Sequence, residues 1–279
     1  MNELNEKIIC PVCPRHCALS EGQTGYCRSR VAKGGEVVSL SYGRHTSVAL
    51  DPVEKKPFAR WHSGKFIISV GTFGCNLRCP FCQNDSISQA DASIETSFLS
   101  PGDLVSLAKK YVTRGNIGIA FTYNEPLIGF EYVRDTARLA KVAGLSAALV
   151  TNGYVTQEKL HEILPYIDAM NIDLKGWTEK YYEWLGGHIE PVKETIKTAA
   201  QKCHVEVTTL IVPGRNDSEQ EMDEESHWLA SISEDMPLHI SRYFPRYMTQ
   251  DIPPTPVEKI YRLVDAAKKN LKYVYSGNC

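Results

Sequence analysis

Beyond about residue 65 the chain alternates between short, largely apolar runs and longer segments in which apolar positions recur at helical spacing. Continuous apolar runs are typical of strands buried on both faces of a parallel sheet, and amphipathic segments between them are typical of the helices that cover such a sheet. The pattern therefore predicts six βα units. The six expected strands are 66–70, 117–121, 146–150, 169–174, 205–212 and 238–244.

The helices expected between and after these strands carry recognisable start signals. Ser100, Pro101 and Asp103 predict an N-cap, a proline at the first helical position and an acidic first turn. Thr255 begins the last helix in a similar way, and residues 273–275 then have strand character. Six repeats are fewer than the eight of a closed (β/α) barrel. The expected helices run over 101–115, 127–143, 157–164, 191–202, 218–232 and 255–269.

The residues before the first of these strands have a different pattern. Residues 37–42 and 46–50 have strand character on either side of a short turn, which predicts a β-hairpin. The chain then enters 51–57, a charged segment that lies between two prolines. This segment is either a solvated turn or a loop that carries Lys55 or Lys56 towards an anionic substrate, since functional residues concentrate on loops.

Composition and charge narrow the function classes. With 279 residues, of which 43% are hydrophobic, the chain can bury a sizeable core. Its 31 basic and 33 acidic residues give a net charge of −2 without a long like-charge run, so bulk electrostatics favours neither nucleic acid nor a membrane surface. Residues 1–7 are polar, and no apolar run reaches the length of a membrane span. We therefore expect a cytoplasmic protein that binds neither nucleic acid nor a membrane.

Three cysteines mark the candidate catalytic centre. Cys75, Cys79 and Cys82 follow the first expected strand at the spacing C-x3-C-x2-C. Thiolates this close in sequence can converge on a soft metal centre. A four-iron cluster held by three local thiolates would keep one iron open to bind a substrate or cofactor. A structural zinc knuckle is the alternative, but closed zinc sites take four ligands and the flanking residues offer no obvious fourth.

A second group of cysteines lies near the N-terminus, at Cys10, Cys13, Cys17 and Cys27. Four thiolates make a complete site, and the glycines between Cys17 and Cys27 allow the chain to turn the fourth back towards the first three. Such a site holds structural zinc or an auxiliary iron–sulfur cluster in an electron path. The third reading is that these thiols bind nothing in the final protein.

Polar motifs follow successive expected strands. Residues 122–126 (Thr-Tyr-Asn-Glu-Pro) come after the second strand, 151–153 (Thr-Asn-Gly) after the third and 173–175 (Asp-Leu-Lys) at the end of the fourth. Taken singly, each is an ordinary turn or a surface ion pair. Because active sites of (β/α) barrels lie at the carboxyl ends of the strands, their ordered recurrence predicts a single site at this edge.

These motifs resemble the radical S-adenosylmethionine (SAM) superfamily and, within it, the pyruvate formate-lyase activating enzymes. In this resemblance Asn124 and Glu125 replace the usual Gly-Gly-Glu, and Val150 replaces an acidic residue before Thr-Asn-Gly. A closer resemblance, nearly end to end, is to the AmmeMemoRadiSam radical SAM enzymes. It is carried by the four N-terminal cysteines and by residues 51–57, 82–84, 122–126, 150–153, 166–175 and 239–245.

The resemblance implies a fold, cofactors and site residues. It implies an incomplete (β/α)6 TIM-like barrel over residues 63–279, preceded by a Cys-rich segment and β-hairpin over 1–62. It also implies a [4Fe-4S] cluster on the three clustered cysteines, which act as the catalytic centre, and a bound SAM. The SAM-binding candidates are Phe81, Asn124, Glu125, Thr151, Asn152, Asp173 and Lys175, with His239 as a weaker candidate on the substrate side.

The implied function is reductive cleavage of SAM to a 5′-deoxyadenosyl radical, which abstracts hydrogen from an unidentified substrate. A glycyl-radical enzyme activase is the main alternative, and a non-catalytic iron–sulfur electron carrier is an alternative of another class. A carrier needs no SAM-shaped pocket, so the polar motifs favour the enzyme. Expected partners are SAM, a reducing donor such as flavodoxin or ferredoxin, and a protein substrate or AMMECR1-like and Memo-like proteins.

Overall fold

Six parallel strands in sequence order form the centre of the molecule. The structure is a computed structural model that describes residues 7–279, and the polar residues 1–6 discussed above lie outside it. The strands lie in the order β7, β9, β10, β11, β12, β13, as the alternating pattern predicts. Their bounds are β7 (Phe66–Gly71), β9 (Asn116–Phe121), β10 (Ser146–Thr151), β11 (Ala169–Asp173), β12 (His204–Ile211) and β13 (Leu238–Arg242).

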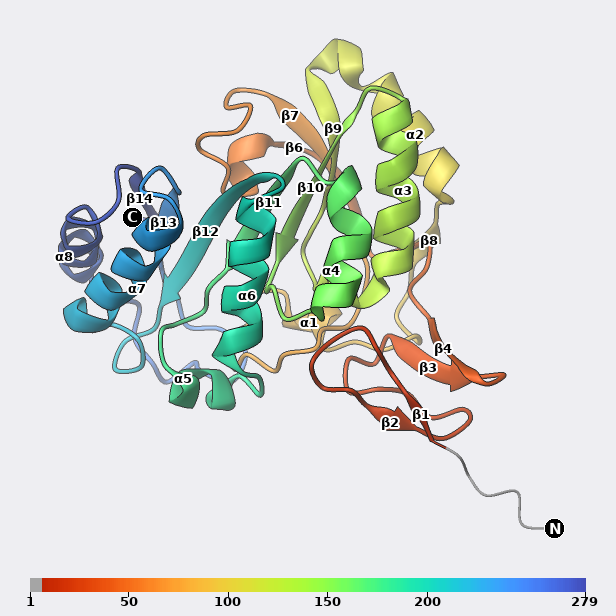
Figure 1. Ribbon diagram of the computed structural model, residues 1–279, viewed down its shortest axis with the longest axis horizontal. Coiled ribbons are helices and arrows are strands. Elements are labelled where there is room, and N and C mark those ends of the chain that lie inside the picture. The colour runs from red at the N-terminus through yellow and green to blue at the C-terminus, as the bar shows by residue number, and fades with distance from the viewer. Residues whose placement is uncertain (1–6) are drawn as a thin grey trace.

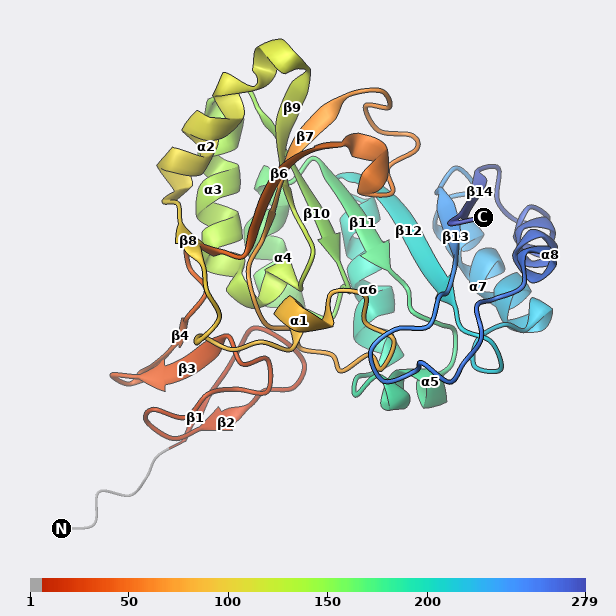
Figure 2. The ribbon, with the colours of Figure 1, turned by 180° about the vertical axis from the view of Figure 1, so that it is seen from behind.

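Two further strands extend this sheet to eight. β14 (Val274–Gly277) adds in parallel to β13, and β6 (Ser47–Pro52) adds in antiparallel orientation to β7. Helices cover one face of the sheet, and the other face is open towards loops and short helices (Figures 1 and 2). This arrangement is a partial TIM barrel, as expected. The longer helices are α2 (Pro101–Lys110), α3 (Phe130–Val142), α4 (Gln157–Ile163), α6 (Ile189–Ala200), α7 (Glu219–Ile232) and α8 (Val257–Ala267).

Short helices occupy several of the connections. Two of them, α1 (Asp85–Ser88) and α5 (Glu179–Trp184), were not expected from the sequence, because helices of four and six residues are too short to show a period. Single 3-10 turns complete the set. They are η1 (Val53–Lys55), η2 (Val112–Arg114), η3 (Pro126–Gly129) and η4 (Leu164–Tyr166).

The expected pairing of residues 37–42 with 46–50 is wrong. β4 (Glu36–Ser39) pairs instead with β3 (Arg30–Lys33), while the second segment becomes β6 of the large sheet. The missed signal is Gly34-Gly35, a two-residue turn in which both residues have positive φ, 63° and 84°. Such turns favour a hairpin between their immediate neighbours.

The remaining strands of the N-terminal region are short. β1 (Ile8–Ile9) pairs with β2 (Ala18–Leu19), and β5 (Arg44–His45) pairs with β8 (Ser97–Phe98). Strands β1 to β4 lie together at one end of the molecule (Figure 1). The division into 1–62 and 63–279 stays a prediction, although β6 shows that the large sheet draws on residues before 63.

Residues 53–62, which we call the floor segment, cross the open face of the partial barrel between β6 and β7. The side chains of Val53 and Phe58 are completely buried against a row of residues on the sheet. Small side chains in that row leave room for the phenyl ring. The row consists of Ile67, Ala120, Ala148 and Ala169.

A buried carboxylate holds the floor segment in place. Glu206, on β12, accepts hydrogen bonds from the backbone N–H groups of Ala59 (2.9 Å) and Arg60 (2.8 Å). It also accepts from Nε2 of His204 (2.9 Å) and Nε2 of His239 (2.6 Å). Burial by itself favours the neutral acid, but these four hydrogen bonds outweigh it and lower the pKa of Glu206 to about 2.

We expect Glu206→Gln to lower the free energy of unfolding by about 3 kcal/mol at pH 7, because a shift of one pKa unit corresponds to about 1.36 kcal/mol. The carboxylate is ionised more easily in the folded state, so its contribution is complete above the ordinary pKa of 4.5 and is lost as the pH falls towards about 2. Urea denaturation at pH 7 and pH 3 measures the difference between wild type and variant, which should shrink at pH 3.

The exposed Glu234 gives the matched control, since Glu234→Gln should change stability by no more than about 0.5 kcal/mol at either pH. Equal stability of wild type and Glu206→Gln at pH 7 would contradict the proposed anchoring of the floor segment.

Candidate active site at the carboxyl ends of the strands

One cavity of about 680 Å³ lies at the carboxyl ends of the strands. This volume is within the range of roughly 300–1,000 Å³ that is usual for ligand pockets. Its lining combines the cysteine loop, the polar motifs of the strand ends and the floor segment. The predicted site residues among its lining are Cys75, Cys79, Phe81, Cys82, Asn124, Glu125, Thr151, Asn152, Asp173, Lys175 and His239.

The three clustered thiols therefore face one space. None of them is in a disulfide. Cys75 Sγ accepts from the backbone N–H of Leu77 (3.4 Å) and from Nδ2 of Asn152 (3.6 Å). Burial raises the pKa of the Cys79 thiol to about 12, so a bound metal is needed to hold this sulfur as a thiolate at neutral pH.

These thiols suit a cluster better than a single ion. Among residues 7–279 no three His, Cys, Asp or Glu side chains converge closely enough to hold one metal ion. In a four-iron cluster each thiolate binds a different iron, so its ligands need not converge on one point. Three soft sulfur donors around a single cavity fit a [4Fe-4S] cluster.

Asn124 holds the start of the cysteine loop to the end of β9. Its Oδ1 accepts from the backbone N–H of Thr72 (2.9 Å), and its Nδ2 donates to Thr72 Oγ1 (3.0 Å) and to the Gly74 carbonyl (2.9 Å). Gly74 has a φ of 86°, and a Cβ there would lie 2.4 Å from the Cys27 carbonyl oxygen. Only glycine fits at that position.

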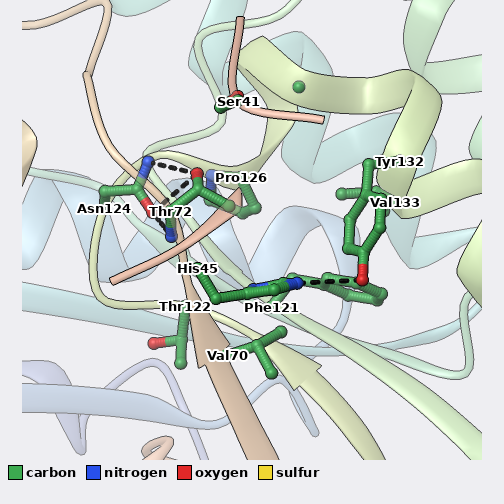
Figure 3. A pocket seen from close by; sticks show the side chains of 11 residues that line it. Ser41, His45, Val70, Thr72, Phe121, Thr122, Asn124, Pro126, Tyr132 and Val133 are labelled. Carbon is green, nitrogen blue, oxygen red and sulfur yellow. Dashed lines mark hydrogen bonds between the residues drawn. The ribbon is translucent and has the colours of Figure 1, made fainter. Parts of the chain in front are cut away.

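A small cavity of about 20 Å³ lies behind the Asn124–Thr72 contact (Figure 3). Nε2 of His45 and the hydroxyl of Tyr132 are 2.9 Å apart at its edge. Burial lowers the pKa of His45 to about 4, so its ring is neutral at pH 7. Thr122 and Asn124 line both this small cavity and the large one.

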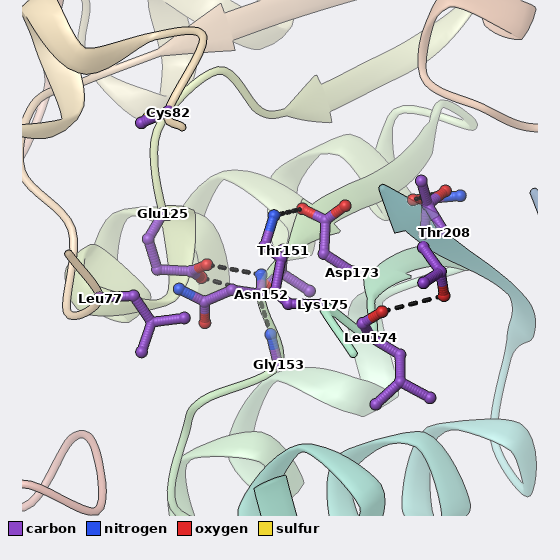
Figure 4. A network of polar contacts seen from close by, with 12 residues as sticks. Leu77, Cys82, Glu125, Thr151, Asn152, Gly153, Asp173, Leu174, Lys175 and Thr208 are labelled. Carbon is purple, nitrogen blue, oxygen red and sulfur yellow. Dashed lines mark hydrogen bonds and ion pairs between the residues drawn. The ribbon is translucent and has the colours of Figure 1, made fainter. Parts of the chain in front are cut away.

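Glu125 joins the ends of two neighbouring strands (Figure 4). Its Oε1 accepts from Leu127 N (2.9 Å) and Thr151 Oγ1 (2.7 Å), and its Oε2 accepts from Asn152 N (2.8 Å). Burial raises the pKa of Glu125 to about 7, although these three hydrogen bonds favour the ionised form. A carboxylate has about four acceptor positions, so one remains on Oε2.

Asp173 and Lys175 lie together at the end of β11. Lys175 Nζ is 2.8 Å from Asp173 Oδ2, and both side chains line the cavity. The backbone of Lys175 is fixed as well, because its N–H donates to the Tyr182 hydroxyl and its carbonyl accepts from Nδ2 of Asn216 (2.9 Å). The pair offers both an anion and a cation to a zwitterionic ligand.

The aromatic residue of the cysteine loop is fixed by other aromatic rings. Phe81 is buried, and its ring centroid lies 6.4 Å from that of Tyr181 and 5.6 Å from that of Trp184. His239, on β13, also lines the cavity. It is linked to the floor segment by Glu206, which binds both the His239 ring and the backbone N–H of Ala59. Val150, which replaces an acidic residue, also lines the cavity.

The structure distinguishes the two lysines of the floor segment. Lys56 is buried and pairs with Asp51 (2.9 Å), with its Nζ 4.3 Å from the centre of the Tyr123 ring. Its charge is therefore already paired within the fold. Lys55 is exposed and lines the cavity, although it also lies 3.6 Å from Asp51. Of the two predicted candidates, Lys55 is the one that can meet a ligand.

The N-terminal cysteines lie close to one another and against the cysteine loop. Burial raises the pKa of Cys13 to about 11, and neighbouring Cys27 and Cys10 act in the same direction. Cys27 in turn is affected by Cys10 and Cys17. The Asn76 side chain, between the first two cysteines of the loop, lies beside Cys13.

Asn76 is a residue of the cysteine loop that sequence reasoning missed, as it missed Glu206. Its Nδ2 donates to the Tyr154 carbonyl (2.6 Å), its Oδ1 accepts from Nδ2 of Asn152 (2.9 Å), and its carbonyl accepts from Nε of Arg15 (2.8 Å). It thus connects the N-terminal region, the cysteine loop and the Thr-Asn-Gly motif. Its position between two cysteine ligands was the only signal, and spacing alone gives no contact.

Comparison with known proteins identifies the family of this chain. The Radical SAM superfamily matches residues 69–229, which is more than half of the chain, and the chain belongs to this superfamily. The superfamily implies a [4Fe-4S] cluster and SAM, and the residues described above fit both. The chain is thus a radical SAM enzyme.

Two relatives show how far the similarity extends. An uncharacterized protein of Methanocaldococcus jannaschii is 38% identical over 278 residues, covering 98% of this chain and 82% of that protein. Pyruvate formate-lyase 1-activating enzyme of Escherichia coli strain K12 is 26% identical over 167 residues, covering 58% of this chain and 66% of that enzyme. The chain therefore spans just under two thirds of the length of that activating enzyme.

Solved structures share the fold. A domain of pyruvate-formate lyase-activating enzyme from Bacteroides vulgatus has a TM-score of 0.51 at 18% identity, covering 58% of this chain and 99% of that chain. SuiB of Streptococcus suis has a TM-score of 0.60 at 13% identity, covering 75% of this chain and 48% of that chain. Within residues 7–279, each helix is too short or too polar to cross a membrane.

We expect Asn124→Ala to loosen the cysteine loop. The change removes three hydrogen bonds to Thr72 and Gly74, each worth about 0.5–1.5 kcal/mol, so we expect a loss of roughly 1.5–4.5 kcal/mol in unfolding free energy and incomplete iron incorporation. Urea denaturation and iron analysis after anaerobic reconstitution measure both. Gln83→Ala, at an exposed position of the same loop, is the control. Full iron content and unchanged stability in Asn124→Ala would contradict the assigned contact.

Proposed function

We propose that this chain binds a [4Fe-4S] cluster through Cys75, Cys79 and Cys82, cleaves SAM reductively and abstracts hydrogen from a substrate held in the same cavity. When bound, the cluster supplies the electron that splits SAM into methionine and a 5′-deoxyadenosyl radical. The observation that carries the proposal is that the three thiols, Asp173 and Lys175 line one cavity.

The residues of the chain then have distinct tasks. The charges of Lys175 and Asp173 lie side by side at the end of β11. Lys175 therefore attracts the carboxylate of SAM, and Asp173 accepts hydrogen bonds from the N–H and O–H groups of SAM. Thr151 and Asn152 orient the groups between them. The remaining acceptor position of Glu125 suits the ammonium of SAM, and Asn124 keeps the cysteine loop in register with that position. The buried Phe81 excludes water beside the thiols.

A glycyl-radical activase is the second candidate for the overall reaction. It is favoured by the sequence similarity to pyruvate formate-lyase activating enzymes, at 26% identity over 58% of the chain. In that case the substrate is the backbone of another protein. In the first case the substrate is a small molecule or a protein side chain.

The surrounding partners follow from the same chemistry. Reductive cleavage of SAM consumes one electron, so we infer a low-potential donor such as flavodoxin or ferredoxin. A cytoplasmic location would supply both the donor and the reducing conditions that keep nine cysteines free. AMMECR1-like and Memo-like proteins are proposed partners on the strength of the sequence resemblance alone.

We further infer a metal centre on the N-terminal cysteines. Cys10, Cys13 and Cys27 are buried and Cys17 is half-buried; Cys27 and Cys10 help to raise the pKa of Cys13, and Cys10 and Cys17 help to raise the pKa of Cys27. Contact with Asn76 of the cysteine loop favours an iron–sulfur cluster in an electron path over structural zinc, because a purely structural site has no need to adjoin the loop.

The triple replacement of Cys75, Cys79 and Cys82 by Ala should abolish cleavage of SAM. The measurement is 5′-deoxyadenosine formed anaerobically with dithionite. Asp173→Asn is the informative partner variant: its thiols are intact, so the cluster should assemble, but SAM affinity should fall roughly tenfold or more through loss of a charged hydrogen bond. If the triple variant still forms 5′-deoxyadenosine, the cluster assignment is wrong.

Replacing Cys10, Cys13, Cys17 and Cys27 by Ser should remove one metal centre and leave the other. Iron and zinc analysis with Mössbauer spectroscopy separates the outcomes: loss of iron indicates a second cluster, and loss of zinc indicates a structural ion. Cys203→Ser is the control, because this thiol lies on another part of the fold. Unchanged iron and zinc in the quadruple variant would exclude the second site.

A further inference from the structure

The inner end of the cavity is lined by residues to which the SAM assignment gives no task. They come from the floor segment and from the last three strands of the sheet, so they lie on segments that are far apart in sequence. They are Lys55, Pro57, Thr208, His239, Ser241 and Ser276. Three of these residues carry hydroxyl groups, one carries an ammonium group and one an imidazole, and this end is therefore suited to a polar ligand.

His239 is the most precisely held of these side chains. Its Nε2 lies 2.6 Å from Oε2 of Glu206, and its ring stacks on Tyr275 with centroids 5.2 Å apart and planes 23° apart. The residue is only 8% exposed, and His239 is one of the residues that line the cavity. Hydrogen bond and stacking together allow one orientation of the imidazole.

Glu206 decides which nitrogen of His239 carries the hydrogen. The backbone N–H groups of Ala59 and Arg60 donate to this carboxylate, and the imidazoles of His204 and His239 are able to donate to it. Its low pKa of about 2 keeps it ionised. An ionised carboxylate can only accept, so Nε2 of His239 donates to it. In the neutral ring Nδ1 is then the acceptor.

Nδ1 of His239 is open to the cavity. Within residues 7–279 it makes no hydrogen bond, and it is not one of the fully buried polar atoms that lack a partner there. A histidine that served only to anchor Glu206 would need one nitrogen. The second nitrogen of His239 is instead presented to the space beside the SAM-binding residues.

We propose that Nδ1 of His239 is the substrate-side acceptor of this cavity, that it selects a substrate with an O–H or N–H group, and that Glu206 is its positioning residue. The proposal deepens the function proposed above and rests on it in one respect, that the substrate occupies this cavity. Glu206 on β12 and Tyr275 on β14 contact the ring, and His204 on β12 shares Glu206 with it. The other charged groups that line the cavity are Glu54 and Lys55 of the floor segment, Glu125 after β9, and Asp173 and Lys175 on β11.

The tautomer is the first test. In cluster-loaded, full-length protein with ¹⁵N-labelled histidine, two-bond ¹H–¹⁵N correlation should show hydrogen on Nε2 of His239 and none on Nδ1. His204→Gln, which removes the other imidazole from Glu206 and is not part of the cavity lining, should leave this signature in place. A hydrogen on Nδ1 of His239 in wild-type protein, in a neutral ring or in an imidazolium, would overturn the proposal, because Nδ1 could then not accept.

The second test uses phenol, whose hydroxyl can donate, and anisole, which has the same ring without a donor. Wild-type protein should bind phenol roughly three- to tenfold more tightly than anisole, as one hydrogen bond provides, and phenol should shift the ¹⁵N resonance of Nδ1. In His239→Phe, which keeps a ring against Tyr275, the two probes should bind alike. His239→Gln should restore part of the preference, since its amide can still donate to Glu206 and accept from phenol.

Equal binding of phenol and anisole in wild type, or a phenol preference that survives in His239→Phe, would refute the assignment of His239. Should His239→Phe fail to fold, the wild-type tautomer and the wild-type comparison of the two probes still decide. None of these measurements requires SAM cleavage. A failure of the proposed function would appear instead as absence of 5′-deoxyadenosine from wild-type protein, so the two failures are distinguishable.

Discussion

The site depends on how the cysteine loop is fixed to strands that follow it in sequence. The loop between β7 and β8 carries three thiols but contains only the four residues of α1 as regular structure, so its shape depends on contacts with other parts of the fold. Its anchors come from outside. Asn124 binds its first residues, and Asn76 binds the backbone of Tyr154 and the side chain of Asn152. Because these partners end β9 and β10, the thiols are placed relative to the sheet itself.

The floor segment, on another side of the cavity, is likewise held by contacts with residues of the sheet. The floor segment has one turn of helix, and it is held by the buried carboxylate of Glu206 and by Phe58, which fits over a row of alanines on the sheet. Glu206 also orients His239. One buried charge therefore fixes both the floor segment and a side chain that lines the cavity. A buried carboxylate that accepts four hydrogen bonds is stable in its ionised form. Because two of these bonds come from the backbone of the floor segment, they hold that segment in a fixed position.

Much of this architecture could be predicted from residue patterns. The six parallel strands and their covering helices follow from continuous apolar runs alternating with amphipathic segments, and α2 begins at the Ser100 and Asp103 capping box that the sequence indicates. The pairing of 37–42 with 46–50 was wrong, because strand character does not identify a partner. The Gly34-Gly35 turn gave 36–39 to β3 and left 47–52 for the edge of the large sheet.

The sequence by itself determined the class of chemistry, since the spacing of Cys75, Cys79 and Cys82 and the motifs at 122–126, 151–153 and 173–175 are local features. Only the tertiary structure decided which of two adjacent lysines lines the cavity. Lys56 is buried in contact with Asp51 and Tyr123, whereas Lys55 is exposed. It also decided the roles of Asn76, Glu206 and His239. Their partners lie on other strands, and hydrogen bonds between residues distant in sequence leave no periodic or local signal in the chain.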